Sequence, residues 1–337
     1  MRDCSKILIA HGGGGGLSYQ LIKELFLPAF ENPVSKKLDD AACLPLQGKR
    51  IAFSTDSYVV KPLFFLGGDI GKLAVCGTIN DLAMMGAEPL YISAAFIIEE
   101  GFPLDTLKRV INSMKEIAKE TGVLIVTGDT KVVEKGSLDQ IFINTAGIGY
   151  IDGDLNISGS NAKVGDVVIL SGTIGDHGIA VLSQRDGFKF ESRLKSDCAP
   201  LNKLVSKMVE KSKNIHVLRD PTRGGIATTL NEISLQSGIE ILIKEKDIPI
   251  RDEVRAACEI LGLDPLNLPS EGKLIAFVSG EDAHLVLQAM REDPLGKDAT
   301  IIGEVSGNTQ SRVLLETIIG GTRIVNLPEG DLLPRIC

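Results

Sequence analysis

Residues 90–127, LYISAAFIIEEGFPLDTLKRVINSMKEIAKETGVLIVT, contain the pattern that decides the fold. Leu90–Ile98 and Val123–Thr127 are two apolar runs of strand length. Between them, Leu104–Lys119 places its apolar residues at helical spacing, and Gly122 is a typical helix stop. A strand, a helix and a second strand in this order indicate a layered α/β structure.

The alternation of strands and helices continues on both sides of this stretch. The first half predicts helices over Leu17–Phe30 and Asp69–Met85, and strands over Ala41–Leu46, Ile51–Ser54 and Ile141–Tyr150. The second half predicts helices over His177–Gln184, Leu201–Ser212, Thr222–Gln236, Asp252–Leu261 and Glu281–Arg291. Its strands are expected at Val167–Ser171, Ile215–Leu218, Ile239–Ile243, Leu274–Val278, Thr300–Val305, Val313–Glu316 and Arg323–Val325.

The pattern breaks between residues 151 and 166, where glycine, serine and asparagine gather. We place a domain boundary there, which gives domains at residues 1–152 and 153–327. Residues 328–337 are then a flexible C-terminal tail. A length of 337 residues suits two domains of ordinary size. The fold class is therefore predicted to be α/β (α+β), with two mixed α/β domains.

Composition excludes several classes of function. The net charge of −8, the absence of tryptophan and an aromatic content of 4% argue against a nucleic-acid-binding protein. No apolar run approaches the roughly 20 residues of a membrane helix, and the run Ile7–Ala10 is too short for a signal peptide. We therefore expect a cytoplasmic protein that binds neither nucleic acid nor membrane.

The six cysteines are scattered and form no C-x-x-C motif, which disfavours a zinc site or a disulfide framework. Cys43, Cys76 and Cys258 lie among apolar residues and are predicted to be in the core. Cys337 is the last residue, three positions after Pro334, and a proline disfavours helix. The tail is thus expected to be an extended arm with a thiol at its tip, either a frayed end or a carrier thiol that enters an active site.

A run of five glycines, Gly12, Gly13, Gly14, Gly15 and Gly16, is the first candidate phosphate site. A glycine loop between a strand and a helix presents free N–H groups to an anion. Leu17 stands where a dinucleotide fingerprint needs glycine, and no P-loop lysine follows. The run is therefore more typical of a mobile flap than of a rigid cradle.

The stronger signal is a set of aspartates in what we interpret as small-residue turns. Several of them lie at strand ends or helix starts, where α/β proteins collect site residues. Such carboxylates, together with phosphate oxygens and waters, would suit Mg²⁺, although aspartate is also a common turn and helix-capping residue. Asp81 stands out because it falls within an apolar helix, where an acid without a partner is costly. The set comprises Asp39, Asp40, Asp56, Asp69, Asp81, Asp129 and Asp220.

Three further residues are candidates for catalysis. Lys131 follows Gly128-Asp129-Thr130 and could offset phosphate charge, or it could simply be solvated. Glu271 lies between a proline turn and a glycine, and is either a general base or a turn acid. His177 either contacts the substrate or only begins a helix.

Taken together, these motifs resemble the superfamily of ATP-dependent enzymes that includes aminoimidazole ribonucleotide (AIR) synthetase and selenophosphate synthetase. Within it they are most similar to the HypE family of hydrogenase maturation factors, the carbamoyl dehydratases. The aspartate set is typical of the superfamily, and the terminal Pro-Arg-Ile-Cys is typical of the family. The residues that carry the resemblance are 11–16, 54–60, 68–73, 80–86, 127–133, 175–178, 219–225, 270–272 and 334–337.

The resemblance implies two AIR synthase-like domains, of which the N-terminal one pairs in a homodimer to form a β-barrel-like core that holds ATP. It implies that Asp40, Asp56, Asp81 and Asp220 hold Mg²⁺ on the triphosphate, with the choice between Asp39 and Asp40 left open. The ATP site would further include the glycine run 12–16, Asp69, Lys72, Asp129 and Thr130.

The resemblance also implies the chemistry and the partners. A HypF-type carbamoyltransferase would load Cys337, ATP would drive dehydration of the carbamoyl group to a thiocyanate, and a HypC–HypD scaffold would receive cyanide for a [NiFe] hydrogenase. Glu271 would remove the nitrogen proton, through His177 or a water, while Lys131 offsets charge. Two alternatives stay open: a small-molecule kinase or synthetase of the same superfamily, and a non-catalytic nucleotide-binding scaffold.

Overall fold

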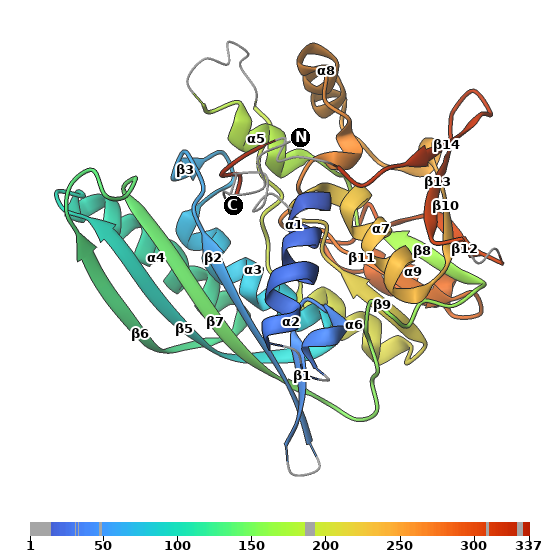
Figure 1. Cartoon of the computed structure of the whole chain (residues 1–337), viewed down its shortest axis with the longest axis horizontal. Coiled ribbons are helices and arrows are strands. Elements are labelled where there is room, and N and C mark those ends of the chain that lie inside the picture. The colour runs from blue at the N-terminus through green and yellow to red at the C-terminus, as the bar shows by residue number, and fades with distance from the viewer. Residues whose placement is uncertain are drawn as a thin grey trace.

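The computed structural model describes residues 15–30, 32, 34–46, 49–185, 193–307, 310–328 and 333–337. Two α/β layers lie side by side, and the N-terminal helical segment runs between them (Figure 1). The C-terminus returns to the region where the two layers meet. Among the described residues, no helix is both long enough and apolar enough to cross a membrane.

The first layer is a five-stranded sheet in the order β1-β2-β7-β5-β6. Only the pair β5–β6 is parallel, and this is the pair that α4 connects, because parallel neighbours need a crossover. The sheet thus confirms the strand–helix–strand prediction for residues 90–127. Its elements are β1 (Ala42–Leu46), β2 (Lys49–Tyr58), β5 (Ala87–Glu99), α4 (Leu104–Thr121), β6 (Leu124–Val133) and β7 (Ile141–Ile151).

Helix α3 (Ile70–Met84) packs against this sheet and against α4. Its small residues allow its neighbours to approach closely. A Cβ at Gly71 would lie 2.4 Å from the Val110 carbonyl oxygen on α4, and a Cβ at Gly77 would lie 2.2 Å from the Tyr58 hydroxyl. Both positions therefore require glycine, and α3 is held at the inner face of β2.

The second layer is a seven-stranded sheet in the order β14-β13-β10-β12-β8-β11-β9. Its strands are β8 (Asp166–Leu170), β9 (Ile215–Arg219), β10 (Glu240–Lys244), β11 (Ile275–Ser279), β12 (Thr300–Ser306), β13 (Arg312–Glu316) and β14 (Thr322–Val325). Its helices are α5 (Asp176–Leu182), α6 (Asn202–Lys211), α7 (Gly225–Ser237), α8 (Asp252–Leu261) and α9 (Ala283–Arg291). A short ladder of β3 (Phe64–Phe65) and β4 (Gly68–Asp69) precedes α3, and the sequence did not predict it.

Two strands are longer than predicted, and this corrects the interpretation of the aspartates. Strand β2 continues to Tyr58 and β6 continues to Val133. Asp56 and Asp129 therefore lie within strands and not in turns, whereas Asp81 lies within a helix, α3, as predicted. The polar residues that suggested turns are accommodated because each strand has a face or an edge open to a cavity or to solvent.

The N-terminal helical segment comprises α1 (Gly15–Leu21), a π turn over Ile22–Phe26, and α2 (Leu27–Phe30). Its helical state confirms the prediction for residues 17–30. Two of its large apolar side chains, Ile22 and Leu25, are not buried but are 40% and 57% exposed.

Candidate active site

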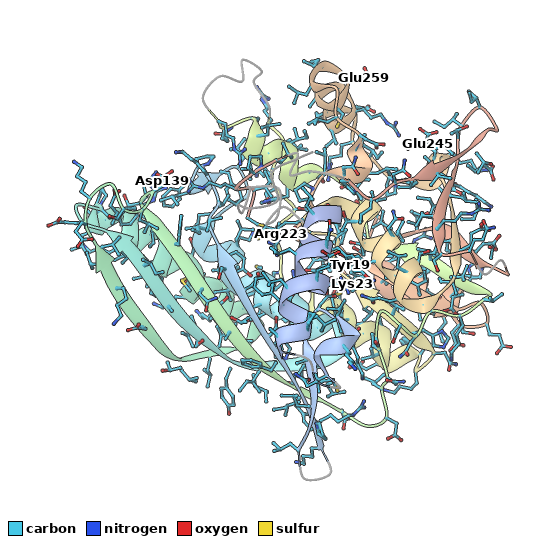
Figure 2. The ribbon with its side chains drawn as sticks, viewed as in Figure 1. Tyr19, Lys23, Asp139, Arg223, Glu245 and Glu259 are labelled. Carbon is cyan, nitrogen blue, oxygen red and sulfur yellow. The ribbon has the colours of Figure 1, made fainter. Side chains whose placement is uncertain are left out.

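A cavity of about 480 Å³ lies between the two layers and collects most of the predicted acids. Ser18, Tyr19 and Leu21 of α1 line the cavity, as does Arg223; Tyr19 and Arg223 are labelled in Figure 2. Strand β2 and helix α3 supply acids from the first domain, and the turn after β9 supplies them from the second. The predicted acids that line it are Asp39, Asp40, Asp56, Asp81 and Asp220.

Asp81 projects from α3 toward this cavity and is poorly compensated. Its Oδ2 accepts a hydrogen bond from the Ser54 hydroxyl at 2.5 Å. Burial raises the pKa of Asp81 well above its usual range, and the negative charges of Asp220, Asp56 and Asp40 raise it further. An acid that is partly buried and faces three like charges is stabilised as an anion by nearby cations, and Arg223 is one that interacts with it.

The neighbouring acids also have raised pKa values. Burial raises the pKa of Asp220 to about 6. Burial also raises the pKa of Asp56, whose Oδ2 accepts a hydrogen bond from the Tyr58 hydroxyl at 3.1 Å. Acids with raised pKa values that share one cavity are typical of functional sites.

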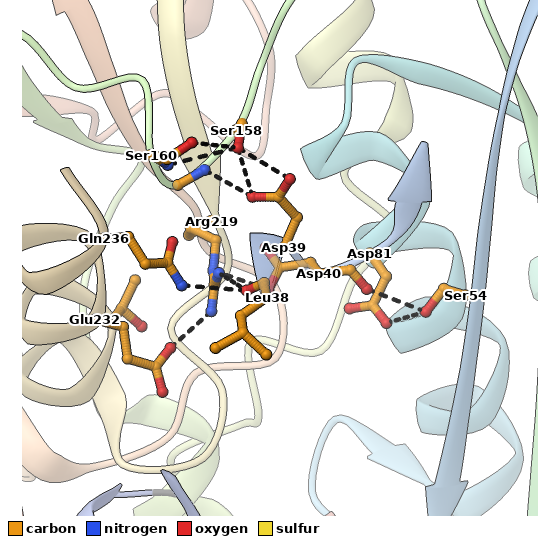
Figure 3. Close-up of polar contacts among 12 residues, drawn as sticks. Leu38, Asp39, Asp40, Ser54, Asp81, Ser158, Ser160, Arg219, Glu232 and Gln236 are labelled. Carbon is orange, nitrogen blue, oxygen red and sulfur yellow. Dashed lines mark hydrogen bonds and ion pairs between the residues drawn. The ribbon is translucent and has the colours of Figure 1, made fainter. Parts of the chain in front are cut away.

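Asp39 and Asp40 are neighbours in the sequence but make different contacts (Figure 3). Asp39 accepts hydrogen bonds from the Ser158 hydroxyl and from the Gly159 N–H, all at 2.8–2.9 Å, and so ties the first domain to the second. Asp40 pairs through Oδ1 with Arg219 at 2.8 Å, whereas its buried Oδ2 has no hydrogen-bond partner among the described residues. Asp40 is therefore the one with an oxygen left for a ligand.

The acids fit a divalent cation that is shared with a phosphate ligand. Among the described residues, no three His, Cys, Asp or Glu side chains converge closely enough to hold a metal alone. The orphaned Asp40 oxygen and the frustrated Asp81 nevertheless leave carboxylate oxygens open in one cavity. Mg²⁺ commonly takes one or two carboxylates and completes its shell with phosphate oxygens and waters, so the donor set suits it.

Glu271 is buried at the border of the two domains, in a loop that is held rigidly. Its N–H donates to Asp197, and the preceding Ser270 N–H donates to the Pro221 carbonyl in the turn that follows β9. Burial raises the pKa of Glu271 well above its usual range, and its Oε1 has no hydrogen-bond partner among the described residues. The predicted base is thus pre-positioned with one oxygen available.

The C-terminal residues 333–337 fold back into the junction of the domains, which corrects the expectation of an extended arm. Leu333 and Ile336 are buried in the core cluster, and a turn at Pro334–Arg335 directs the chain inward. A main-chain carboxyl oxygen of Cys337 accepts a hydrogen bond from the Val59 N–H, just beyond the end of β2. Burial of two large apolar side chains outweighs the freedom of a frayed end.

His177 holds this tail. One ring nitrogen, Nε2, lies 2.8 Å from the Ile336 carbonyl oxygen, and Nδ1 lies 2.8 Å from the Ser196 hydroxyl. A carbonyl only accepts, so Nε2 carries the proton. Burial lowers the pKa of His177, which keeps the ring neutral. Both nitrogens are engaged, so His177 has none left to relay a proton from Glu271.

Other predicted residues lie apart from the cavity. Asp129, Thr130 and Lys131 lie on the exposed edge strand β6, three strands away from β2. Lys131 is 72% exposed and 3.8 Å from Asp129. Asp69 caps α3 by accepting from the Gly71 and Lys72 N–H groups, which is the capping alternative that the sequence left open.

The glycine run, Lys72 and three of the cysteines were also singled out in the sequence. Residues 11–14 lie outside the described part of the chain, whereas Gly15 and Gly16 begin α1. Lys72 donates to the Gly67 carbonyl at 3.0 Å. Cys76 and Cys258 are buried as predicted, and Cys43 is only partly buried.

Comparison with known proteins identifies the family. The N-terminal domain of AIR synthase related proteins matches residues 38–151, and their C-terminal domain matches residues 163–316. The carbamoyl dehydratase HypE of Cupriavidus necator is 51% identical over 333 residues, which are 98% of this chain and 95% of the relative. The chain belongs to the HypE family of carbamoyl dehydratases.

Two solved HypE structures have the same fold. The HypE of a HypE–HypF complex superposes with a TM-score of 0.87 at 53% identity, over 91% of this chain and 99% of its own. A HypE solved in complex with ATP superposes with a TM-score of 0.83 at 50% identity, over 98% of this chain and 100% of its own. The predicted α/β fold with two AIR synthase-like domains is thereby confirmed.

Two arginines near the C-terminal tail of this HypE family member, Arg223 and Arg185, were not predicted from the sequence. Arg223 lines the cavity, and its pKa is raised first by negative charge at Cys337 and then by Asp56 and Glu271. Arg185 donates to the tail carbonyls of Pro334 and Arg335. Arg223 lies within residues 219–225, which carry the resemblance, and an arginine so close to Asp220 was the signal that could have found it.

Proposed function

We propose that this chain dehydrates a carbamoyl group carried on the Cys337 sulfur to a thiocyanate, with ATP as the phosphoryl donor. The observation that supports it best is the docked terminus. The last residue lies beside Val59, two domains meet around it, and Arg223 connects it electrostatically with Asp56 and Glu271. The terminal cysteine is thus placed among charged side chains, those of Arg223, Asp56 and Glu271. A cysteine with a purely structural role does not need such surroundings.

The reaction balances in two steps. The carbonyl oxygen of the S-carbamoyl group attacks the γ-phosphorus of ATP, so that an O–P bond forms, the β–γ bridge breaks and ADP leaves. The nitrogen then loses its two protons, the C–O bond breaks, and the oxygen departs with the phosphate. The carbon and nitrogen remain on the sulfur as a nitrile, and phosphorylation has turned a poor leaving oxygen into a good one.

The chain's own residues divide the work between them. Glu271 accepts a nitrogen proton, because a carboxylate that burial makes more basic is well suited to this task. Arg223 offsets the negative charge that develops near Cys337. His177 positions the tail through the Ile336 carbonyl.

Asp40, Asp56, Asp81 and Asp220 would hold Mg²⁺ together with the triphosphate oxygens. The ion would supply charge neutralisation on the phosphates and fix their orientation. The ATP complex of a 50% identical HypE supports a nucleotide at this fold.

A second copy of the chain would complete the site. Strand β6 is an edge strand with exposed apolar side chains, among them Leu124, Val126 and Val132, which are 58–65% exposed. Such an edge favours pairing with another chain. A homodimer formed along the first domain, with a barrel-like core, would bring Asp129, Thr130 and Lys131 to the neighbouring chain's nucleotide.

The partners follow from the chemistry. A HypF-type carbamoyltransferase would load Cys337, in line with the HypE–HypF complex of a 53% identical chain. A HypC–HypD scaffold would accept the cyanide group, because a thiocyanate carbon transfers readily to a nucleophilic metal centre.

The test is a comparison of Cys337→Ala with Cys43→Ala, a cysteine away from the tail. Each protein is incubated with the carbamoyltransferase, carbamoyl phosphate and Mg·ATP, and protein-bound nitrile is quantified. We expect the Cys43→Ala protein to form it and the Cys337→Ala protein to form none. Nitrile formation by Cys337→Ala would overturn the proposal. ATP turnover on a free small molecule without any adduct would favour a kinase, and nucleotide binding without turnover would favour a scaffold.

A further inference from the structure

We propose that Arg185 acts as a latch: it binds the backbone of the C-terminal tail, residues 333–337, and so sets the fraction of time for which Cys337 is docked between the two domains. The proposal concerns a positioning residue, which neither the sequence motifs nor the reaction scheme assigns. It builds on the proposed function, because a carrier thiol must leave its site to be loaded and return to be processed.

The tail is held through the main-chain oxygens of four consecutive residues, 334–337. Arg185 Nη2 donates at 2.7 Å to the carbonyls of both Pro334 and Arg335. His177 donates to the Ile336 carbonyl at 2.8 Å, and the Val59 N–H donates to a main-chain carboxyl oxygen of Cys337 at 3.0 Å. Because these bonds go to backbone oxygens, a group attached to the Cys337 sulfur leaves them in place.

Arg185 is also the point at which the dock joins the two domains. It follows α5 in the second domain, and its Nε donates at 2.8 Å to the Lys61 carbonyl in the first domain. The Lys61 N–H in turn donates to the Arg335 carbonyl at 3.1 Å. The guanidinium therefore bridges the tail and the segment after β2, and its planar fork is suited to holding several carbonyls at once.

A second, more exposed contact supports the same register. Arg335 donates through Nε to the Val59 carbonyl at 2.8 Å and pairs with Asp139, which also binds Lys61 at 2.7 Å. The hydrogen bonds from Lys61 and Arg335 lower the pKa of Asp139 to about 2. Asp139 lies on the connection between β6 and β7, at the edge of the first domain in Figure 2. Its ion pairs are open to solvent, so we assign the main latch to Arg185.

The latch predicts opposite effects on two events. Weakening it exposes Cys337 more often, which favours reagents or partners that must reach the thiol. The same change lowers the fraction of tail that is aligned with the site, which slows dehydration without altering how ATP binds.

The experiment measures alkylation of Cys337 by iodoacetamide in the native full-length protein, followed by mass spectrometry of the C-terminal peptide. Hydrogen bonds from a charged donor justify an increase of roughly tenfold in the labelling rate for Arg185→Gln. Arg185→Lys keeps the charge but loses the fork, so its rate should lie between the two. Arg323→Gln, which removes a surface pair with Asp264 far from the tail, is the matched control and should label like the unaltered protein.

Buried Cys76 and Cys258 in the same digest report whether the protein has opened as a whole. The latch is supported if Cys337 labelling rises while these two stay protected, and if single-turnover dehydration slows with an unchanged KM for ATP. Unchanged Cys337 labelling in Arg185→Gln, or a parallel rise at Cys76, overturns it. Labelling needs no catalysis, so failure of the proposed dehydration in the unaltered protein would remain distinguishable.

Discussion

The acids around Asp81 and the motif Asp129-Thr130-Lys131 look alike in the sequence but occupy opposite physical environments. Asp81 is enclosed between β2, α3 and the turn after β9, and its pKa is raised by burial and by like charges. Asp129 and Lys131 are 64% and 72% exposed on an edge strand and neutralise each other at 3.8 Å. From this difference we propose that both groups serve one charged site. The acids around Asp81 would be its enclosed half, and Asp129 and Lys131, which face outward, would be its exposed half, brought to the site by a second chain.

The largest expected effect is on the enclosed half. Asp81→Asn should lower ATP-dependent dehydration by at least roughly a thousandfold, since the metal clamp it would serve supplies several kcal/mol. Asp39→Asn is the matched control, because both Asp39 oxygens already bind Ser158 and Gly159, and it should lose less than about tenfold. Single-turnover kinetics on carbamoylated protein measures both. Equal losses would remove the distinction between Asp39 and the cavity acids.

The exposed half is tested by mixing two inactive variants. Lys131→Ala alone should lose roughly a hundredfold or more, as expected for a cation that acts on a developing charge. If Lys131 serves the site of a second chain, an equal mixture of Lys131→Ala and Asp81→Asn should recover about a quarter of the unaltered activity, because half of the dimers are mixed and each has one intact site. A mixture as inactive as its components would place Lys131 in the site of its own chain, and an unchanged rate for Lys131→Ala alone would place it outside the reaction.

Protonation of Glu271 should slow the reaction on the acid side of its pH–rate profile. Burial raises its pKa above the ordinary carboxyl value of 4.5, and only the ionised form accepts a proton. The rate should therefore rise with pH, about tenfold per unit below that raised pKa, and level off above it. Glu271→Gln should be slow and flat over the same range. A pH profile shared by both proteins would assign the proton transfer elsewhere.

The smallest effect is on stability, and it has an unusual sign. Asp220 has a folded pKa of about 6 against 3.8, so its stabilising contribution is present below pH 3.8 and is lost as the pH rises through 6. Without nucleotide, Asp220→Asn should therefore stabilise the fold at pH 8 by on the order of 1–3 kcal/mol and by much less at pH 4. Urea unfolding at both pH values measures it. Destabilisation at pH 8 would mean that the carboxylate is already well compensated.

The sequence predicted most of the fold because the apolar periods are regular. The helix Leu104–Lys119 and the Gly122 stop correspond to α4 and its left-handed cap, with φ of 79°. Strand β2 was predicted too short, because Ser54–Ser57 alternates polar residues toward a cavity that no local pattern reveals.

The candidate site was only partly predictable, since its contacts are non-local. Cys337 was recognised from its position, but the inward turn depends on Arg185 and His177, which lie more than 140 residues away along the chain. The division between Asp39 and Asp40 depends on Ser158 and Arg219 in the other domain. Spacing along the sequence contains no information on such pairings.

The most direct measurement of the central claim is mass spectrometry of the C-terminal peptide after incubation with a carbamoyltransferase, carbamoyl phosphate and Mg²⁺. We predict a carbamoyl adduct on Cys337 that loses the mass of one water molecule when ATP is present and keeps it with a non-hydrolysable analogue. An adduct that keeps its mass with ATP, or no adduct on Cys337, would contradict the account of a carrier thiol processed at this site.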